Sequence, residues 1–173
     1  MFALIFGLSF LANAQDVQKD QPKGYQFTDI KRLPATSVKD QARAGTCWSW
    51  SGISFFESEM IRMGKEPIDL SAMYIVRHAY SDKATKFVRL HGNMNFAVGG
   101  AFCDVMHVIK NYGIVPMDVY KGLNYGEPNH AFGEIDDVLA GYINAVIKNS
   151  NKKLSTAWKK GFDGILDAYL GEE

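Results

Sequence analysis

The sequence is poor in cysteine and proline and has no excess of charge. Its only cysteines, Cys47 and Cys103, allow one bridge at most, which excludes a fold scaffolded by disulfides. With 5 prolines and no internal repeat, it contains no proline-rich linker and no repeat array. It carries 19 basic and 19 acidic residues. Because proteins that bind nucleic acids or acidic substrates usually carry a basic excess, we expect neither kind of partner.

Long hydrophobic runs are also scarce, and the clearest one lies at the N-terminus. The run FALIFGLSFL at 2–11 is too short to span a bilayer, and an A-x-A cleavage pattern follows at 12–14. We therefore expect residues 1–14 to be a signal peptide of an exported protein without a stable membrane anchor, and 15–24 to be a polar leader. No Lys or Arg precedes the run, which leaves a misplaced start codon or a hydrophobic N-terminal arm as alternatives.

Apolar residues make up 47% of the chain, and their helical spacing predicts a mostly helical protein. The first helix should begin at Thr46 or Cys47, with the Thr46 hydroxyl as its N-cap, and end at Gly64. The second should begin at Ser71, capped by its hydroxyl, and 87–98 should be a loop. Three further helices are expected over 102–112, 132–146 and 158–169. No sheet is predicted.

The helix expected over 102–112 has an apolar stripe that we expect to face the core. Its members are Phe102, Val105, Met106, Ile109 and Tyr112. Cys103 lies among these residues, so we expect it to be a packed and inert hydrophobic side chain.

Cys47 stands in a different context, the segment QARAGTCWSW at 41–50. A helix N-terminus carries partial positive charge, which stabilises a thiolate, the nucleophilic form of cysteine. Gln41 lies six positions earlier, and its side-chain N–H together with the Cys47 backbone N–H could form a two-donor oxyanion hole. Gly45 leaves room for a substrate backbone, and Trp48 can shield the site from water. A lone cysteine is more often buried and inert, but this context favours a nucleophile.

The segment VKDQARAGTCWSWSGISFFE at 38–57 resembles the active-site segment of papain-like cysteine peptidases. Ala44 stands where that family usually has a second cysteine. This departure, the stretches LSAMYIVRHAY and GGAFCDVMHVIKNYGIVP, and the helical tail are more similar to the bleomycin hydrolase or aminopeptidase C branch. That branch contains bacterial and eukaryotic aminopeptidases. The resemblance covers residues 25–173.

The resemblance implies roles for four residues. Cys47 matches the nucleophile and Gln41 matches the donor to the oxyanion. Gly99 and Gly100 match a pair that lines the substrate cleft, where an edge of backbone hydrogen-bonds an extended peptide. Val98 replaces the Asn or Asp that usually precedes this pair. Without the resemblance, Gln41 would be a surface residue and the glycine pair a turn.

A cysteine peptidase also needs an imidazole, which in this family comes from a second, β-rich domain and is oriented by an asparagine. The triplets at 129–131 (NHA) and 148–150 (KNS) imitate these two elements. The residues between them follow a helical period where the family has a strand, and no Trp-Gly follows Ser150. We therefore expect His130 and Asn149 to be look-alikes. The other histidines are expected within helices, at the surface or half-buried (His78, His107), or in a loop (His91).

Together these features predict an α+β papain-like fold, of which residues 25–173 form the mostly helical, nucleophile-bearing part while the β-rich domain is missing. The resemblance implies an exported bacterial cysteine aminopeptidase, periplasmic or extracellular, that cleaves peptides through a Cys47 acyl-enzyme. It implies no metal or organic cofactor, inactivity of this part alone, and a homo-oligomer, hexameric in the branch. The alternative is a non-catalytic, peptidase-like module that binds peptide. An inhibitory propeptide-like protein is a weaker alternative, because the Gln-Cys pair is intact.

Overall fold

The computed structural model describes Gly24, Tyr25 and residues 27–173. The expected signal peptide at 1–14 lies outside the described residues, as does nearly all of the leader. The chain divides into two compact units at Arg32–Leu33. The described part of the first unit forms no helix or strand, and its Tyr25 and Phe27 side chains are exposed, with ring centroids 6.4 Å apart.

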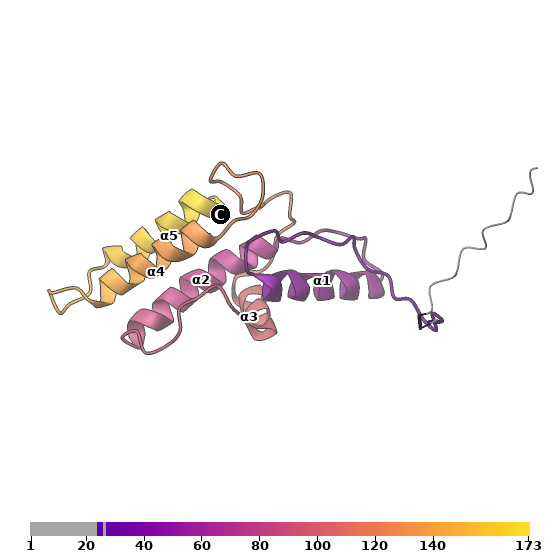
Figure 1. The fold of residues 1–173 in the computed structure, drawn as a ribbon, viewed down its shortest axis with the longest axis horizontal. Coiled ribbons are helices and arrows are strands. Elements are labelled where there is room, and N and C mark those ends of the chain that lie inside the picture. The colour runs from indigo at the N-terminus through magenta and orange to yellow at the C-terminus, as the bar shows by residue number, and fades with distance from the viewer. Residues whose placement is uncertain (1–23, 26) are drawn as a thin grey trace, which may run out of the picture. The chain divides into compact units, whose positions relative to one another are not determined.

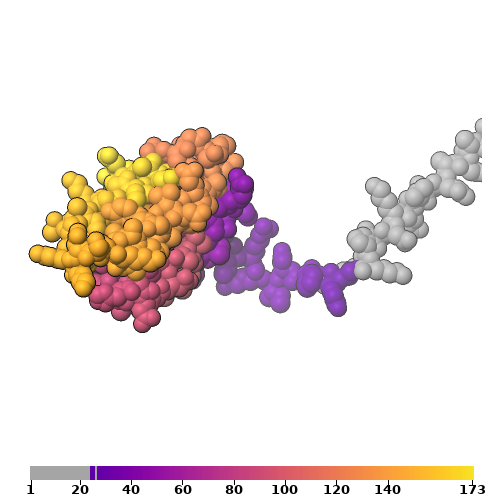
Figure 2. Space-filling view, turned by 60° about the vertical axis from the view of Figure 1, so that its left-hand side comes forward, coloured from indigo at the N-terminus to yellow at the C-terminus, as the bar shows by residue number. Residues whose placement is uncertain are grey.

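The second unit, residues 33–173, is built from helices. They are α1 (Cys47–Arg62), α2 (Ala72–Arg89), α3 (Phe102–Tyr112), α4 (Gly133–Ile147) and α5 (Ala157–Leu170). The central helix α2 contacts all the others; α1 packs with α3, and α4 lies beside α5 (Figure 1). Much of the face in Figure 2 belongs to the α4–α5 pair, with α2 along its lower edge. The described residues form no strand and only two isolated bridges, Arg43 with Ala131 and Leu70 with Pro116.

The helix boundaries follow from local chemistry. The Ser71 hydroxyl accepts the N–H of Tyr74 at 3.0 Å, which confirms the predicted N-cap of α2. Gly64, with a φ of 77°, follows the end of α1 in the left-handed conformation that glycine adopts without strain. The prediction of a loop over 87–98 is wrong for its first residues, because α2 continues to Arg89.

The predicted role of Thr46 is half right. Thr46 is the N-cap of α1, and Cys47 is its first residue, but the Thr46 hydroxyl accepts no N–H from the helix. Its φ and ψ of −107° and 33° differ from the extended conformation in which an N-cap side chain reaches the first turn. The hydroxyl instead accepts the indole N–H of Trp50 at 3.2 Å.

The core lies where α2 meets its neighbours. The largest fully buried side chains in this core are Tyr80, Phe132, Phe162, Ile53, Met73, Ile75, Ile135, Leu139, Ile143, Leu166 and Leu170. Burying this apolar surface is the main driving force that holds the helices together. No helix of the described chain is both long and apolar enough to cross a membrane.

The apolar stripe predicted for α3 is largely wrong. Phe102, Met106 and Tyr112 are 45%, 49% and 44% exposed, whereas Val105 and Val108 are completely buried. The reason is that α3 packs only on α1 and α2, so it buries one narrow face. The Cys103 side chain points away from that face and is exposed, so the prediction that it is packed in the core is also wrong.

Candidate active site

A tight turn leads into α1. The N–H of Ala42 donates to Asp40 Oδ1 at 2.7 Å, and the N–H of Ala44 donates to the Gln41 carbonyl at 3.2 Å. Ala42 has a φ of 50°, in the left-handed region that alanine rarely occupies. Gln41 is half-buried in this turn, and Ala44 is completely buried. The turn therefore has a defined backbone conformation immediately before the predicted nucleophile.

A segment far away in the sequence holds this turn in place. The Arg43 N–H donates to the His130 carbonyl at 2.9 Å, and the Phe132 N–H donates to the Arg43 carbonyl at 3.2 Å. These two bonds form the parallel bridge between Arg43 and Ala131. The segment just before α4 thus fixes the backbone between Gln41 and Cys47.

Cys47 is the first residue of α1, and its thiol is free and exposed. Its neighbours Thr46 and Trp48 are buried. The thiol therefore lies at the surface, at the helix end where backbone N–H groups and the helix dipole favour negative charge. Among the described residues no hydrogen bond joins Cys47 to Gln41, although the same short turn places both at this end of α1.

The glycine pair reaches this end of α1 through Trp48. The Trp48 indole N–H donates to the Val98 carbonyl at 3.0 Å. Gly100 lies so close to the ring that a Cβ added there would be 2.5 Å from Trp48 Cε2. Both glycines are exposed. The structure thus brings the Gly99–Gly100 backbone next to the residue that follows Cys47.

Val98 fits this arrangement in place of the Asn or Asp that usually precedes the pair. A Cβ added at Gly45 would lie 3.1 Å from Val98 Cγ2, so the Val98 side chain packs over the glycine. The φ of Gly45 is +66°, which further favours glycine. The turn before Cys47 and the glycine segment are therefore in direct contact.

Sequence reasoning missed one residue at this site, Lys83 of α2. Its Nζ donates to the Gly99 carbonyl and lies 5.3 Å from the centroid of the Trp48 ring. Burial lowers the pKa of this amine. No sequence signal could have found it, because a single lysine in an amphipathic helix resembles any surface lysine.

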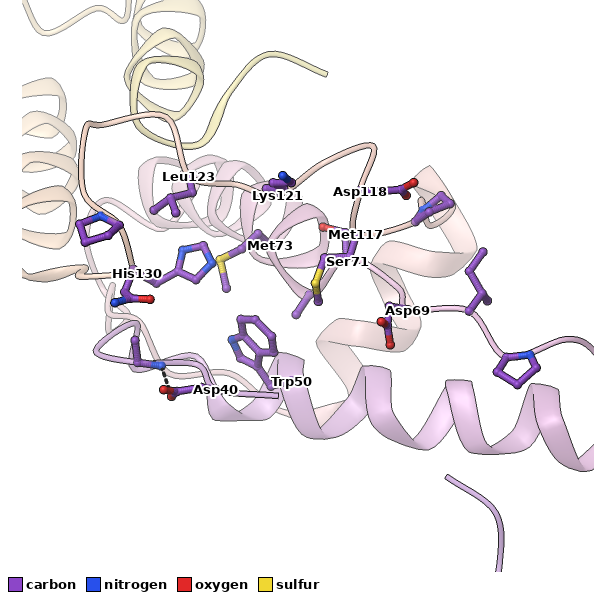
Figure 3. Close-up of a pocket in the computed structure, with 17 residues that line it drawn as sticks. Asp40, Trp50, Asp69, Ser71, Met73, Met117, Asp118, Lys121, Leu123 and His130 are labelled. Carbon is purple, nitrogen blue, oxygen red and sulfur yellow. Dashed lines mark hydrogen bonds between the residues drawn. The ribbon is translucent and has the colours of Figure 1, made fainter. Parts of the chain in front are cut away.

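His130 lines a pocket of about 720 Å³ on the Trp50 side of α1 (Figure 3). Its ring centroid is 5.9 Å from that of Trp50, and Met73 and Asp40 line the same pocket. Cys47 is not among the lining residues. Burial lowers the pKa of His130, because an apolar environment disfavours the charged imidazolium. The expectation that His130 is a look-alike remains a prediction.

The other look-alike and the remaining histidines have local partners. Asn149 donates its amide to the Val146 carbonyl at 2.7 Å, just after α4 ends. His107 is exposed and pairs with Asp82, and His91 is exposed in the turn after α2, as expected. His78, however, is 5% exposed, so the prediction that it lies at the surface or half-buried is wrong.

His78 is buried because two tyrosine rings cover it. Its ring stacks on Tyr112 at a centroid distance of 4.2 Å and meets the edge of Tyr74 at 4.4 Å. Its Nε2 is 3.2 Å from a Glu173 carboxylate oxygen, and burial lowers the pKa of His78. In the described part of the chain no hydrogen bond joins Cys47 to any imidazole.

An exposed thiol at the start of a helix, beside a two-glycine backbone edge, is suited to attack on a bound peptide. These features are those expected of a cysteine peptidase. Residues 22–158 match the family model described as papain family cysteine protease. The chain therefore belongs to the papain family, and the five helices of its described residues agree with the helical part of a papain-like domain. No curated protein matches the chain.

Proposed function

We propose that Cys47 is the nucleophile of a cysteine aminopeptidase of the bleomycin hydrolase branch. The side-chain N–H of Gln41 and the backbone N–H of Cys47 are the oxyanion donors, and the Gly99–Gly100 backbone binds the peptide. The observation that carries this proposal is the position of the exposed Cys47 thiol. It lies at the first residue of α1, and the next residue, Trp48, lies against Gly100.

The chemistry follows from that arrangement. The Cys47 thiolate attacks the carbonyl carbon of the scissile bond, and the negative charge on the oxygen is stabilised by the two N–H donors. The C–N bond then breaks, and the leaving amine takes a proton and departs. Water attacks the resulting thioester, releasing the acid and restoring the thiol. The second N–H donor requires Gln41 to turn its amide toward the substrate, and the half-buried turn restricts its position.

Two features support the assignment to this branch. Ala44 is completely buried where other family members place a cysteine, so the site is built without that disulfide. The α4–α5 pair follows the glycine segment and packs on α2, as a helical insertion would. Assignment to this branch leads to three further proposals. The protein is exported by a bacterium to the periplasm or the extracellular space, its substrates are peptides with a free amino terminus, and it forms hexamers.

The mechanism also needs a general base. We propose that a histidine and an asparagine outside residues 24–173 complete the site, and that this chain alone does not turn over peptides. The alternative, a non-catalytic peptide-binding module, is favoured by one observation, namely that no imidazole of the described chain is hydrogen-bonded to Cys47. Both proposals share the peptide-binding edge.

A peptidyl epoxide tests the nucleophile, because Cys103 is a second exposed thiol in the same chain. We expect the epoxide to alkylate Cys47 faster than Cys103 by tenfold or more, on the order of the gain from 1.4 kcal/mol of specific binding. Peptide mapping by mass spectrometry gives both rates. Cys47→Ser should abolish the fast reaction, and Cys103→Ser should leave it intact. Equal rates at the two thiols would contradict a specific site at Cys47.

Substrates that differ only at the amino terminus test the aminopeptidase proposal. With protein purified from its native cells, we expect a fluorogenic aminoacyl substrate to be cleaved and its N-acetylated counterpart to resist. Equal cleavage of both would indicate an endopeptidase. Cleavage of neither, together with retained peptide binding, would favour the non-catalytic module.

A further inference from the structure

We propose that Lys83 is a positioning residue that fixes the Gly99–Gly100 edge for the peptide substrate. The proposal rests on the proposed function, because it assigns Lys83 a role only if that edge binds peptide. Lys83 belongs to α2, which is neither the nucleophile helix nor the glycine segment.

Three hydrogen bonds hold the segment that contains the two glycines. Lys83 Nζ donates to the Gly99 carbonyl, and the Trp48 indole N–H donates to the Val98 carbonyl at 3.0 Å. At the other end, the Ala101 N–H donates to Asp104 Oδ2 at 2.8 Å. The backbone on both sides of Gly100 is therefore tied to neighbouring side chains.

Gly100 itself is left with its backbone groups free. Within the described part of the chain, neither its N–H nor its carbonyl oxygen forms a hydrogen bond, and the residue is exposed. One N–H and one carbonyl on the same residue are what an extended peptide pairs with when it adds to a backbone edge. Because Lys83 donates to the Gly99 carbonyl, that oxygen already has a partner, whereas both backbone groups of Gly100 remain available to a peptide.

The position of the Lys83 ammonium is itself well defined. It lies 5.3 Å from the Trp48 ring centroid and 5.8 Å from that of Tyr80, so two aromatic faces stabilise the cation. Tyr80 is buried and donates its hydroxyl to Asp136 of α4 at 2.9 Å. Trp48 of α1 and Tyr80 of α2 thus contact the amine that supports the glycine edge, and Asp136 of α4 holds the Tyr80 hydroxyl.

The experiment compares Lys83 with a matched lysine on the same helix. Lys83→Met removes the donor, Lys83→Arg keeps a donor and a charge, and Lys86→Met removes the exposed lysine one turn further along. The first readout is the rate of Cys47 alkylation by a peptidyl epoxide divided by the rate with iodoacetamide, which needs no peptide edge. The second is amide hydrogen exchange at Gly99–Ala101. Circular dichroism checks that each variant is folded.

We expect Lys83→Met to lower the epoxide-to-iodoacetamide ratio about fivefold, as the loss of one supporting hydrogen bond implies, and to speed exchange at Gly100 and Ala101. Lys83→Arg and Lys86→Met should stay within about twofold of the wild type. If Lys83→Met does not fold, Lys83→Gln, with a shorter donor, is measured in its place and should show a loss in the same direction.

The results separate this inference from the function on which it rests. If the wild type shows no preference for the peptidyl epoxide, the proposed function fails, and the exchange data still test whether Lys83 orders the segment. If the wild type shows the preference and Lys83→Met keeps both the preference and slow exchange, the positioning role is wrong. Equal losses in Lys83→Met and Lys86→Met would assign the effect to net charge and would also overturn it.

Discussion

Two adjacent glycines at the proposed peptide edge have different surroundings. A Cβ on Gly100 would lie 2.5 Å from Trp48 Cε2, whereas a Cβ on Gly99 would meet no heavy atom within 4 Å. We predict that Gly100→Ala displaces the segment from Trp48, costs about 1–3 kcal/mol of unfolding free energy, and removes the fast epoxide reaction at Cys47. Gly99→Ala is the control for the packing contact and should change the unfolding free energy by little. Urea unfolding and the labelling rate measure these effects, and equal losses of unfolding free energy in the two variants would contradict the packing argument.

A second residue-scale prediction concerns Glu57, which is 1% exposed in α1. Its Oε1 accepts the Leu70 N–H at 2.7 Å, and its Oε2 accepts from Lys39 Nζ at 2.6 Å. We predict that Glu57→Ala lowers the unfolding free energy by about 3 kcal/mol, because it leaves the buried Leu70 N–H without an acceptor. It also removes one carboxylate partner of Lys39, which keeps Asp69.

The matched control for Glu57 is Glu59, two residues further along α1, which pairs with Arg62 at the surface. Because exposed ion pairs contribute little, Glu59→Ala should cost far less than Glu57→Ala. Chemical denaturation of both variants measures the difference. Similar losses in the two would contradict a structural role for the buried carboxylate.

The role of a single residue could be predicted from the sequence only where its partners lie close to it along the chain. The Ser71 cap could be predicted, since a hydroxyl before an amphipathic run acts within one helical turn. Lys83 could not, because its partners Gly99 and Trp48 come from other segments. The prediction that Cys103 is packed was wrong for a related reason. The helices that pack against α3 decide which of its faces is buried, and Cys103 is exposed.

At the scale of elements, one contact between α2 and α4 depends on pH. The Tyr80 hydroxyl donates to Asp136 Oδ1, and burial raises the pKa of Asp136 from 3.8 to about 6. The folded state therefore binds more protons than the unfolded state between these values, so this contribution to stability is present at low pH and lost as the pH rises through about 6.

We predict that Asp136→Asn, which keeps an acceptor for Tyr80, stabilises the protein above pH 6 by about 1 kcal/mol after allowance for screening at this half-buried site. The gain should fall toward zero near pH 4, where the carboxyl is neutral. Asp137→Asn, which removes an exposed charge from the same turn, is the control. Thermal unfolding across this pH range measures both, and a gain that does not vary with pH would contradict the assignment.

Helix positions could be predicted because apolar residues recur with a period of about 3.6 in the sequence. The five helices in the described part of the chain begin within a residue or two of the expected positions. The orientation of α3 was not predictable. Its apolar residues are compatible with more than one buried face, and packing on α1 and α2 selected the face with Val105 and Val108.

At the scale of the whole molecule, the sequence predicted a mostly helical chain of the papain family, and the fold and the family match confirm that much. The motif around Cys47 made this possible, because its chemistry requires particular residues at fixed spacing. The pairing of the turn at 41–44 with residues 130–132 could not be predicted, since two isolated backbone bonds leave no periodic pattern in the chain.

The proposed export can be tested at the N-terminus of the mature protein. If residues 1–14 are removed on secretion, the mature protein begins at Gln15. We expect N-terminal sequencing of the native protein to give Gln15, and fractionation to place it outside the cytoplasm. Met1 at the terminus of the mature protein would contradict export.

The two backbone bonds that tie Arg43 to His130 and Phe132 have a consequence for synthesis. Ribosomes release the N-terminal part first and add about 5–20 residues per second, so Cys47 emerges on the order of ten seconds before its supporting segment. During that interval the thiol is present while the turn that leads to it has no partner. The turn before Cys47 is therefore completed late in synthesis, only after residue 132 has been added and can donate its N–H to the Arg43 carbonyl.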